Sequence, residues 1–286
     1  MIKQAIHAGG IAAHEPLHEL IRDLKLKVLR MATSAGGGYV AQGIGSAEIV
    51  AALFYRYLRL DPQNPDWPDR DRFLLSVGHY AISVYAAMVK LGFFREEQLD
   101  TYSIDGSELE MIGSELTRGM EITGGSLAQG LSQGVGLAIS GKLRKSAWNV
   151  YVLLSDGELE EGQTWEAAMV AKHHRLDNLI AIVDVNDVQA DGRIGDVTGI
   201  HPIVEKWQSF GWMVIEIDGN QIQAVIEALE KCKTTLDGRP KMIIANTIMG
   251  NGISSLHGKP DVHYVKWSPE QNEIAILEIT NGVKFA

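Results

Sequence analysis

Two polar side chains follow apolar runs at positions 30 residues apart. Asp156, with Gly157 after it, ends the run 150–154, and Asn186 follows the run 179–183. The intervening stretch 164–175 is rich in Ala and Glu and is typical of a helix. Such a strand–helix–strand unit makes parallel neighbours. We therefore expect Asp156 and Asn186 to emerge together at the carboxyl edge of a sheet, where open α/β sheets bind ligands.

This pair of oxygen ligands predicts a magnesium site that also holds a phosphate group. Carboxylate and amide oxygens are hard donors suited to Mg²⁺, for which Ca²⁺ or Mn²⁺ can substitute. Two side chains do not close a cage, but Mg²⁺ commonly shares its remaining positions between phosphate oxygens and water. Gly157 allows close approach of a diphosphate to the backbone. The alternative is that Asp-Gly and Asn-Asp are simply turn residues.

A histidine and a set of glycines accompany this pair. His79 lies just past the apolar run 72–76, so the same sheet edge receives it, although a helix cap or a core histidine would also fit. The segment 121–130 is rich in small residues and leads into a helical stretch, 131–142. Gly130, Gly134 and Gly136 are unfavourable in an exposed helix. They indicate close packing against the sheet or against a partner subunit.

The elements that position these residues form an α/β pattern. Five apolar runs alternate with helical segments; they are 72–76, 150–154, 179–183, 213–217 and 241–247. This pattern predicts a doubly wound, mainly parallel sheet with helices on both faces. We interpret residues 1–286 as one domain, with an N-terminal helical extension over about 1–35 and a polar C-terminal tail over about 260–286. The tail is available to contact a neighbouring subunit.

Composition narrows the range of partners. The chain has 286 residues and a net charge of −10, which disfavours nonspecific binding to nucleic acid and to anionic membranes. We find neither a signal peptide nor a run of the roughly 18 apolar residues that a membrane span needs. Cys232 is the only cysteine, so no intrachain disulfide can form. We therefore expect a cytoplasmic protein that binds neither nucleic acid nor membranes.

Three phrases resemble one enzyme family. The Asp156-Gly157 pair followed 30 residues later by Asn186 is similar to the thiamine diphosphate fingerprint, GDG…N, with Ser155 in place of its first Gly. The stretch SDGELEEGQTWEAAMVAK resembles transketolases, as does DRFLLSVGHYAISVYA around His79. The segment EITGGSLAQG resembles the family phrase TTGPLGQG. The likeness is greatest to N-terminal subunits of transketolases that are encoded as two chains, and it implies their diphosphate-binding fold.

The resemblance assigns roles residue by residue. Mg²⁺ would bind the Asp156 carboxylate, the Asn186 amide oxygen and the Val188 carbonyl, and the diphosphate would contact the Ser155 backbone N–H. The implied cofactor-binding residues are His79, Gly125, Ser126, Leu127, Ser155, Asp156, Gly157, Glu158, Asn186 and His257. His263 competes with His257 for the histidine after the last strand, and we prefer His257. Catalytic roles fall on His79 and His257, and on Glu161 and Glu166 as residues that link two active sites across a dimer interface; ordinary surface charge explains the two glutamates equally well.

The implied activity requires a second chain. Transketolases transfer a two-carbon ketol unit from a ketose to an aldose, which here means sugar or sugar-phosphate substrates. The family's glutamate on the pyrimidine side of the cofactor belongs to another domain, for which 286 residues leave no room. We therefore expect an α2β2 assembly with a separate C-terminal transketolase subunit. The competing interpretations are a non-catalytic cofactor-binding subunit, an E1-type decarboxylase subunit, or one from a 1-deoxysugar synthase. A metal-dependent phosphohydrolase would need more carboxylates at one sheet edge.

Two positions depart from the family pattern. Tyr39 stands where the family usually has a histidine in a GH-x-G phrase, and Ser114 stands where it has the histidine of a GHP phrase. Both histidines contact substrate in ordinary transketolases. Sites built to bond a hydroxyl discriminate strongly when that bond is missing. The departures therefore predict a nonstandard sugar substrate, such as a branched or sulfonated sugar.

Overall fold

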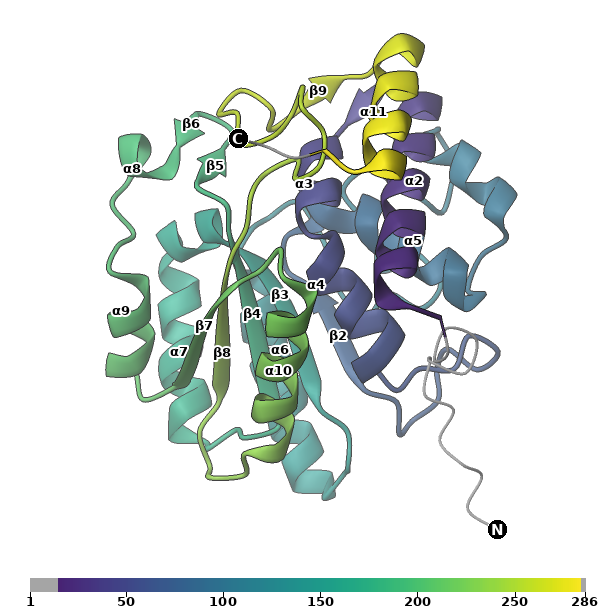
Figure 1. Ribbon diagram of the computed structural model, residues 1–286. Coiled ribbons are helices and arrows are strands. Elements are labelled where there is room, and N and C mark those ends of the chain that lie inside the picture. Colours follow the sequence, from purple (N-terminus) through teal and green to yellow (C-terminus); the bar gives the residue numbers. More distant parts are fainter. Residues whose placement is uncertain (1–14, 284–286) are drawn as a thin grey trace.

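A five-stranded parallel sheet forms the centre of the computed structural model, which describes residues 15–283 (Figure 1). In spatial order its strands are β2 (Arg72–Leu75), β3 (Val150–Ser155), β4 (Leu179–Val185), β8 (Lys241–Asn246) and β7 (Met213–Asp218). Every neighbouring pair is parallel. These strands coincide with the five apolar runs, so the predicted α/β fold with a mainly parallel sheet is confirmed.

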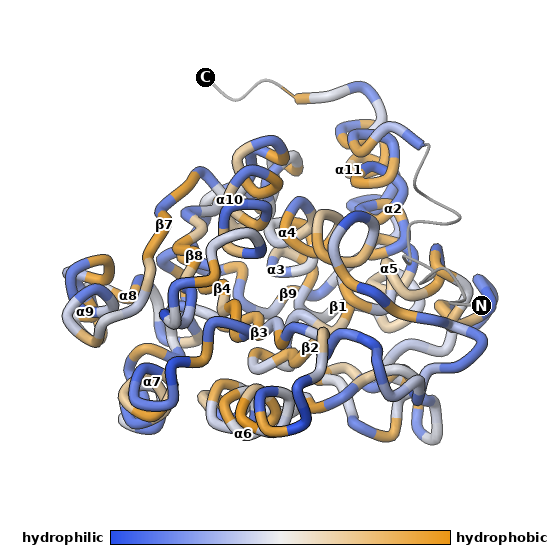
Figure 2. The backbone as a smooth tube through the Cα atoms, turned by 90° about the horizontal axis from the view of Figure 1, so that it is seen from below, coloured by the Kyte–Doolittle hydropathy of each residue, from blue (hydrophilic) through white to orange (hydrophobic). Residues whose placement is uncertain are grey.

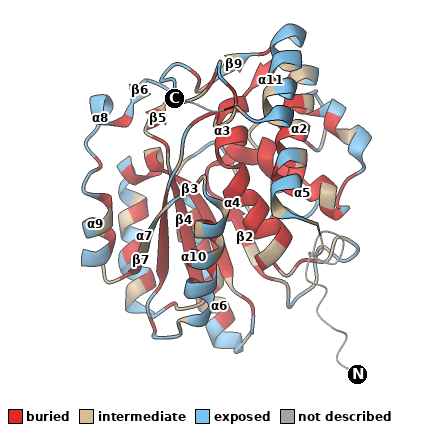
Figure 3. Cartoon of the chain, in the orientation of Figure 1, coloured by how far each residue is buried: buried red, intermediate tan, exposed pale blue. Residues whose placement is uncertain are grey.

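Alternation along the strands separates two apolar cores. In β3, Tyr151 and Leu153 face one core, whereas Val150, Val152 and Leu154 face the other. The first core is covered by α2 (Leu17–Ala35), α4 (Ala47–Ala52), α5 (Ala81–Leu91) and α10 (Ile222–Thr234). The second is covered by α6 (Gln129–Arg144), α7 (Gly162–His173) and α9 (Ile203–Ser209). Figure 2 shows α6 and α7 on one side of the sheet and α4 and α10 on the other, and Figure 3 shows the sheet buried between these layers.

Short elements complete the edge of the sheet at which the strands end. The strands β1 (Gly37–Gly38) and β9 (Val265–Lys266) pair antiparallel, as do β5 (Val188–Gln189) and β6 (Gly192–Arg193). The remaining helices are α3 (Val40–Gly45), α8 (Ile194–Val197), the π-helix η1 (Leu53–Tyr57) and the 3₁₀-helices η2 (Gly78–Tyr80), η3 (Glu96–Thr101) and η4 (Asp156–Glu160). Within residues 15–283, no helix combines the length and apolar character needed to cross a membrane.

The two ends of the described chain lie against each other. Helix α2 begins inside the expected N-terminal extension, of which residues 1–14 lie outside the described part. The region expected as a polar tail instead contains a helix, α11 (Pro269–Asn281), which packs on α2. Ser268 and Gln271 form a capping box at its start, with proline at the first helical position. The polar composition of this segment hid a helix that a capping signal could have revealed.

Glycines in α6 have two different environments. A Cβ on Gly130 would lie 2.7 Å from the Ser76 Cα, and one on Gly134 would lie 2.7 Å from a Val152 methyl. Both glycines therefore allow α6 to approach the sheet closely, as the sequence indicates. Gly136 is exposed, and a Cβ there would meet no atom of the described chain within 4 Å. Packing within this chain therefore does not require glycine at position 136.

This contrast predicts opposite effects of the same substitution in one helix. Gly130→Ala should lower the free energy of unfolding by about 1–3 kcal/mol, because the added methyl overlaps the backbone of Ser76. Gly136→Ala should raise it by about 0.5–1 kcal/mol through helix propensity. Urea denaturation of the isolated chain followed by circular dichroism measures both. Equal changes in the two variants would contradict the packing explanation.

Candidate functional site

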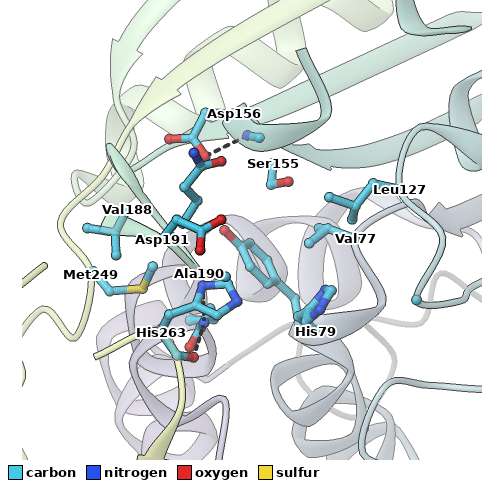
Figure 4. Close-up of a pocket in the computed structure, with 15 residues that line it drawn as sticks. Val77, His79, Leu127, Ser155, Asp156, Val188, Ala190, Asp191, Met249 and His263 are labelled. Carbon is cyan, nitrogen blue, oxygen red and sulfur yellow. Dashed lines mark hydrogen bonds between the residues drawn. The ribbon is translucent and has the colours of Figure 1, made fainter. Parts of the chain in front are cut away.

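A cavity of about 280 Å³ opens at the carboxyl edge of the sheet (Figure 4). Its walls come from α3, from the ends of β2 and β3, from the β5–β6 hairpin and from the segments around Met249 and His263. Asp156 and Ser155 lie at one end of the drawn cavity, and His79 and His263 lie at the other. The lining residues are Gln42, Val77, His79, Tyr80, Gly125, Leu127, Ser155, Asp156, Gly157, Val188, Gln189, Ala190, Asp191, Met249 and His263.

The Asp156 carboxylate connects the ends of β3 and β4. Its Oδ2 accepts the backbone N–H groups of Asn186 at 2.9 Å and Asp187 at 2.7 Å, and its Oδ1 accepts that of Gly157 at 2.9 Å. Asp187 has a φ of 63°, a left-handed conformation that Asp tolerates better than most residues. This turn brings two successive N–H groups onto one oxygen. The predicted proximity of Asp156 and Asn186 is therefore present in the structure.

A second network fixes the Asn186 side chain. Its Nδ2 donates to the Asp184 Oδ2 at 2.8 Å and to the Tyr80 hydroxyl at 2.9 Å. Tyr80 and Thr247 in turn donate short hydrogen bonds to Asp184, which is 2% exposed. Because a carboxylate only accepts, the amide nitrogen must face Asp184. The amide oxygen is thereby directed elsewhere, and it accepts the Val188 N–H at 3.1 Å.

The electrostatics of this end favour a cation. Burial, followed by the charge of Asp184, raises the pKa of Asp156 to about 7, although three backbone N–H bonds oppose the shift. Burial also raises the pKa of Asp184. Within residues 15–283 no cluster of three His, Cys, Asp or Glu side chains could hold a metal by itself. A carboxylate with a neighbouring amide oxygen instead fits Mg²⁺, which completes its shell with phosphate and water.

Two histidines, His79 and His263, form the other end, and Tyr39 packs against both of them. The rings of His79 and His263 are 5.8 Å apart, and Tyr39 lies 4.6 Å from His79 and 5.7 Å from His263. Burial lowers the pKa of His79 to about 4, and the nearby His263 adds to this effect. Burial lowers the pKa of His263 as well, against the influence of Asp191. Both imidazoles are therefore neutral at pH 7, and each carries a single N–H.

His263, not the preferred His257, belongs to this cavity. His263 lines the wall beside His79, whereas His257 is not among the lining residues and its backbone N–H closes a turn onto Ile253. The cavity thus favours His263 over the preferred His257 as the histidine beside His79. The antiparallel pairing of β9 with β1 draws the segment before β9 over α3, and His263 comes with it.

Glu158 has a different place from the one assigned by resemblance. It is completely buried, does not line the cavity, and accepts hydrogen bonds from the Ser76 hydroxyl and the Ala128 and Ser155 backbone N–H groups. Burial raises its pKa to about 7. The Ser155 N–H was expected to contact a diphosphate, but in this structure it donates its hydrogen bond to Glu158. Ser155 still lines the cavity. Glu158 is therefore a structural residue that ties β2, β3 and the start of α6 together.

The small-residue segment before α6 lies between two cavities. Gly125 and Leu127 line the main cavity, and Gly125 and Ser126 also line a second one of about 220 Å³ beside Ser76. A flat ring could therefore lie along this backbone. Ser114 belongs to neither cavity: it is buried, and its hydroxyl oxygen accepts the Leu116 N–H within a separate loop.

Glu161 and Glu166 lie outside the cavity. Glu161 is exposed and directly precedes α7, without a side-chain capping hydrogen bond. Glu166 follows on the exposed face of α7, where Met169 and Val170 are 53% and 42% exposed. The structure thus separates these glutamates from the residues around Asp156.

Sequence reasoning missed Gln42, Tyr80 and Asp184, which hold functional side chains; only the position of Asp184 two residues before Asn186 could have indicated one of them.

Comparison with known proteins identifies the family. Residues 16–284 match the model "Transketolase, thiamine diphosphate binding domain". The chain belongs to the transketolase family, within this domain. It is 40% identical to the 6-deoxy-6-sulfo-D-fructose transketolase subunit SqwG of Clostridium sp. (strain MSTE9), over 85% of this chain and 89% of that protein. It is 36% identical to an apulose-4-phosphate transketolase subunit of Actinobacillus succinogenes (strain ATCC 55618 / DSM 22257 / CCUG 43843 / 130Z), over 93% and 97%.

Solved structures agree with this assignment. Transketolase from Campylobacter jejuni subsp. jejuni NCTC 11168 superposes with a TM-score of 0.86 at 28% sequence identity, over 92% of this chain. The chain spans only 42% of that structure, whereas it spans nearly the whole of the two subunits named above. The resemblance to the N-terminal subunits of two-chain transketolases is thereby confirmed.

The lowered pKa of His79 predicts how the chain responds to acid. Its imidazole should remain neutral until about pH 4 in the folded chain, whereas the unfolded form binds a proton near pH 6.5. The unfolded state therefore binds more protons between these values, and this residue makes stability fall as pH decreases from about 7 to 4. NMR titration of the histidine resonances, assigned with His79→Gln, measures the pKa directly. A midpoint near 6.5 would contradict the burial argument.

Proposed function

We propose that this chain is the diphosphate-binding subunit of a two-chain, thiamine diphosphate-dependent transketolase. The observation that carries the proposal is one cavity with Asp156 and Val188 at one end, Asn186 bonded to both of them, and two neutral histidines at the other end. Asp156 and Asn186 suit a cation, and His79 and His263 offer N–H donors to an anion. A metal-bridged diphosphate requires both kinds of group. The near-complete match to proteins named as transketolase subunits supports the same assignment.

The proposal assigns the cofactor contacts as follows. Mg²⁺, or Ca²⁺ or Mn²⁺ in its place, binds the Asp156 carboxylate, the Asn186 amide oxygen and the Val188 carbonyl. The diphosphate contacts Ser155, Gly157, His79 and His263, and the pyrimidine lies along Gly125, Ser126 and Leu127. Bound thiamine diphosphate supplies the chemistry that moves a two-carbon ketol unit. The chain's own residues anchor the cofactor, hold neutral N–H donors at its tail and bury Asp184 and Tyr80 beneath the cation.

A separate C-terminal subunit completes the enzyme in this proposal. The chain spans about two fifths of a full-length transketolase but nearly the whole of the related subunits, which supports a partner chain that carries the other domains. That subunit supplies the pyrimidine-side glutamate, in an α2β2 assembly. The exposed face of α7 supports this, because Glu166 and the apolar Met169 and Val170 lie together on it at helical spacing. A surface of this composition suits burial between subunits better than exposure to solvent.

The substrate we propose is a nonstandard ketose or ketose phosphate. Tyr39 packs edge-on against His79 and near His263, at the end of the cavity away from Asp156. Its larger ring therefore fills space that a histidine would leave open, and its hydroxyl lies farther from the backbone than the ring nitrogens of a histidine would. The related subunits are named for 6-deoxy-6-sulfo-D-fructose and for apulose 4-phosphate. A sulfonated or branched sugar is accordingly the class of donor we favour for this chain.

Binding calorimetry tests the cofactor assignment. The wild-type chain with its partner should bind thiamine diphosphate only when Mg²⁺ is present. Asp156→Asn should weaken this binding by more than the roughly 10–100-fold that loss of an outer partner costs. Asp196→Asn, an exposed substitution on α8, is the charge-matched control and should bind normally. Metal-independent binding, or equal affinity of the two variants, would reject the site.

Donor competition tests the substrate class. The two-chain enzyme should use 6-deoxy-6-sulfo-D-fructose or apulose 4-phosphate with a higher kcat/KM than xylulose 5-phosphate. Tyr39→His should reduce this preference by about 10-fold or more, because it replaces the larger phenol ring with an imidazole that places its polar atoms nearer His79. Tyr39→Phe keeps the ring and should leave the preference unchanged. Ordinary transketolase activity of the wild type on xylulose 5-phosphate would remove the proposal of an unusual sugar.

A further inference from the structure

Gln42 is a buried amide that contacts His263 across 221 residues of sequence. It lies in α3, is 1% exposed, and lines the main cavity. Its Nε2 donates to the His263 backbone carbonyl at 2.5 Å and lies 3.3 Å from the His263 Nδ1. Figure 4 shows His263 in the wall of the cavity, on the same side as His79. One side chain thus contacts both the backbone and the ring of a cavity histidine.

These contacts determine the orientation of the amide. The His263 carbonyl only accepts hydrogen bonds, so the amide nitrogen of Gln42, not its oxygen, must face it. The second N–H of the same nitrogen then faces Nδ1. Two donors cannot share this contact, so Nδ1 must be the unprotonated nitrogen. A neutral His263 consequently carries its hydrogen on Nε2.

Packing alone does not account for an amide at this position. The Gln42 Oε1 is buried and has no hydrogen-bond partner in residues 15–283. A buried acceptor without a partner is unfavourable, and an apolar side chain of the same length would avoid it. The two N–H groups directed at His263 are what an apolar residue cannot provide.

We propose that Gln42 is a positioning residue that fixes His263 as an Nε2–H donor toward phosphate oxygens in the cavity. The inference rests on the proposed function for the identity of the ligand. The geometric part of the inference does not depend on that function, because Gln42 sets the His263 tautomer in the chain without ligand. Burial keeps the His263 pKa low, so the neutral tautomer, and not a cation, is the form present at pH 7. The groups around this ring are His79 and Tyr39, with Asp191 acting on it through its charge.

The first measurement is the tautomer itself, by long-range ¹H–¹⁵N NMR of the full chain without cofactor. Wild-type His263 should show a protonated Nε2 and a bare Nδ1. Gln42→Met, which keeps length and volume, should give a mixture of tautomers. Gln42→Glu, which gives up the bond to the His263 carbonyl and offers Nδ1 an acceptor in place of a donor, should move the hydrogen to Nδ1. Gln223→Met, an exposed substitution on α10, is the control and should match the wild type.

The second measurement is affinity for thiamine diphosphate with Mg²⁺, by calorimetry on the complex with the partner chain. Gln42→Met should weaken binding by about 10-fold, the loss expected for one misdirected hydrogen bond. His263→Ala should weaken it by at least as much, and the double variant should bind no worse than His263→Ala alone, since Gln42 acts through His263. Melting temperatures identify any variant that is unfolded. If Gln42→Met is unfolded, Gln42→Glu replaces it in this comparison of single and double variants.

Different outcomes test the positioning role of Gln42 and the proposed function of the chain. An unchanged tautomer in both Gln42→Met and Gln42→Glu overturns the positioning role, as do additive affinity losses in the double variant. Absence of thiamine diphosphate binding by the wild-type complex overturns the proposed function, while the NMR result still decides whether Gln42 sets the tautomer.

Discussion

The structure of the site depends on one buried carboxylate that gathers three backbone N–H groups. Asp156 ends β3, and its oxygens receive the N–H groups of Gly157, Asn186 and Asp187. This bonding holds the turn after β4 against the end of β3 and so places Asn186 beside it. The same burial raises the Asp156 pKa to about 7, with Asp184 contributing. The arrangement therefore favours a cation, which would compensate the buried charge that the backbone only partly stabilises.

Glu158 is a second buried carboxylate that accepts several hydrogen bonds, and it lies outside the cavity lining. Its carboxylate joins Ser76 at the end of β2, Ser155 at the end of β3 and Ala128 before α6. The three segments around the cavity are thus connected through side-chain oxygens and not through apolar contacts, which lie below in the two cores. A carboxylate can fulfil this task because it accepts several N–H groups at once. Substitution of Glu158 would leave those donors unpaired inside the protein.

The features of the fold and the site that the sequence predicted correctly are those marked by a short, continuous stretch of residues. The apolar run of β3 and the turn at Asp156 predicted a strand ending at a ligand site, and the crossover rule placed Asn186 beside it. The choice between His257 and His263 had no local signal, because β9 pairs with β1 more than 200 residues away. The role of Glu158 was equally hidden, since its partners come from three separate segments. Helix α11 was missed because its composition is polar, although Ser268 and Pro269 mark its start.

The two ends of the cavity differ in how readily substitution can change them. At the Asp156 end the carboxylate itself bonds only backbone N–H groups, which every residue but proline supplies. The histidine end is built from side chains: Tyr39 packs on His79, and Gln42 bonds His263. Both of these residues belong to the start of α3, so substitutions in one short segment alter the surroundings of both histidines. A substitution at Tyr39 or Gln42 therefore changes the surroundings of the histidines, whereas the bonds that hold Asp156 involve neither residue.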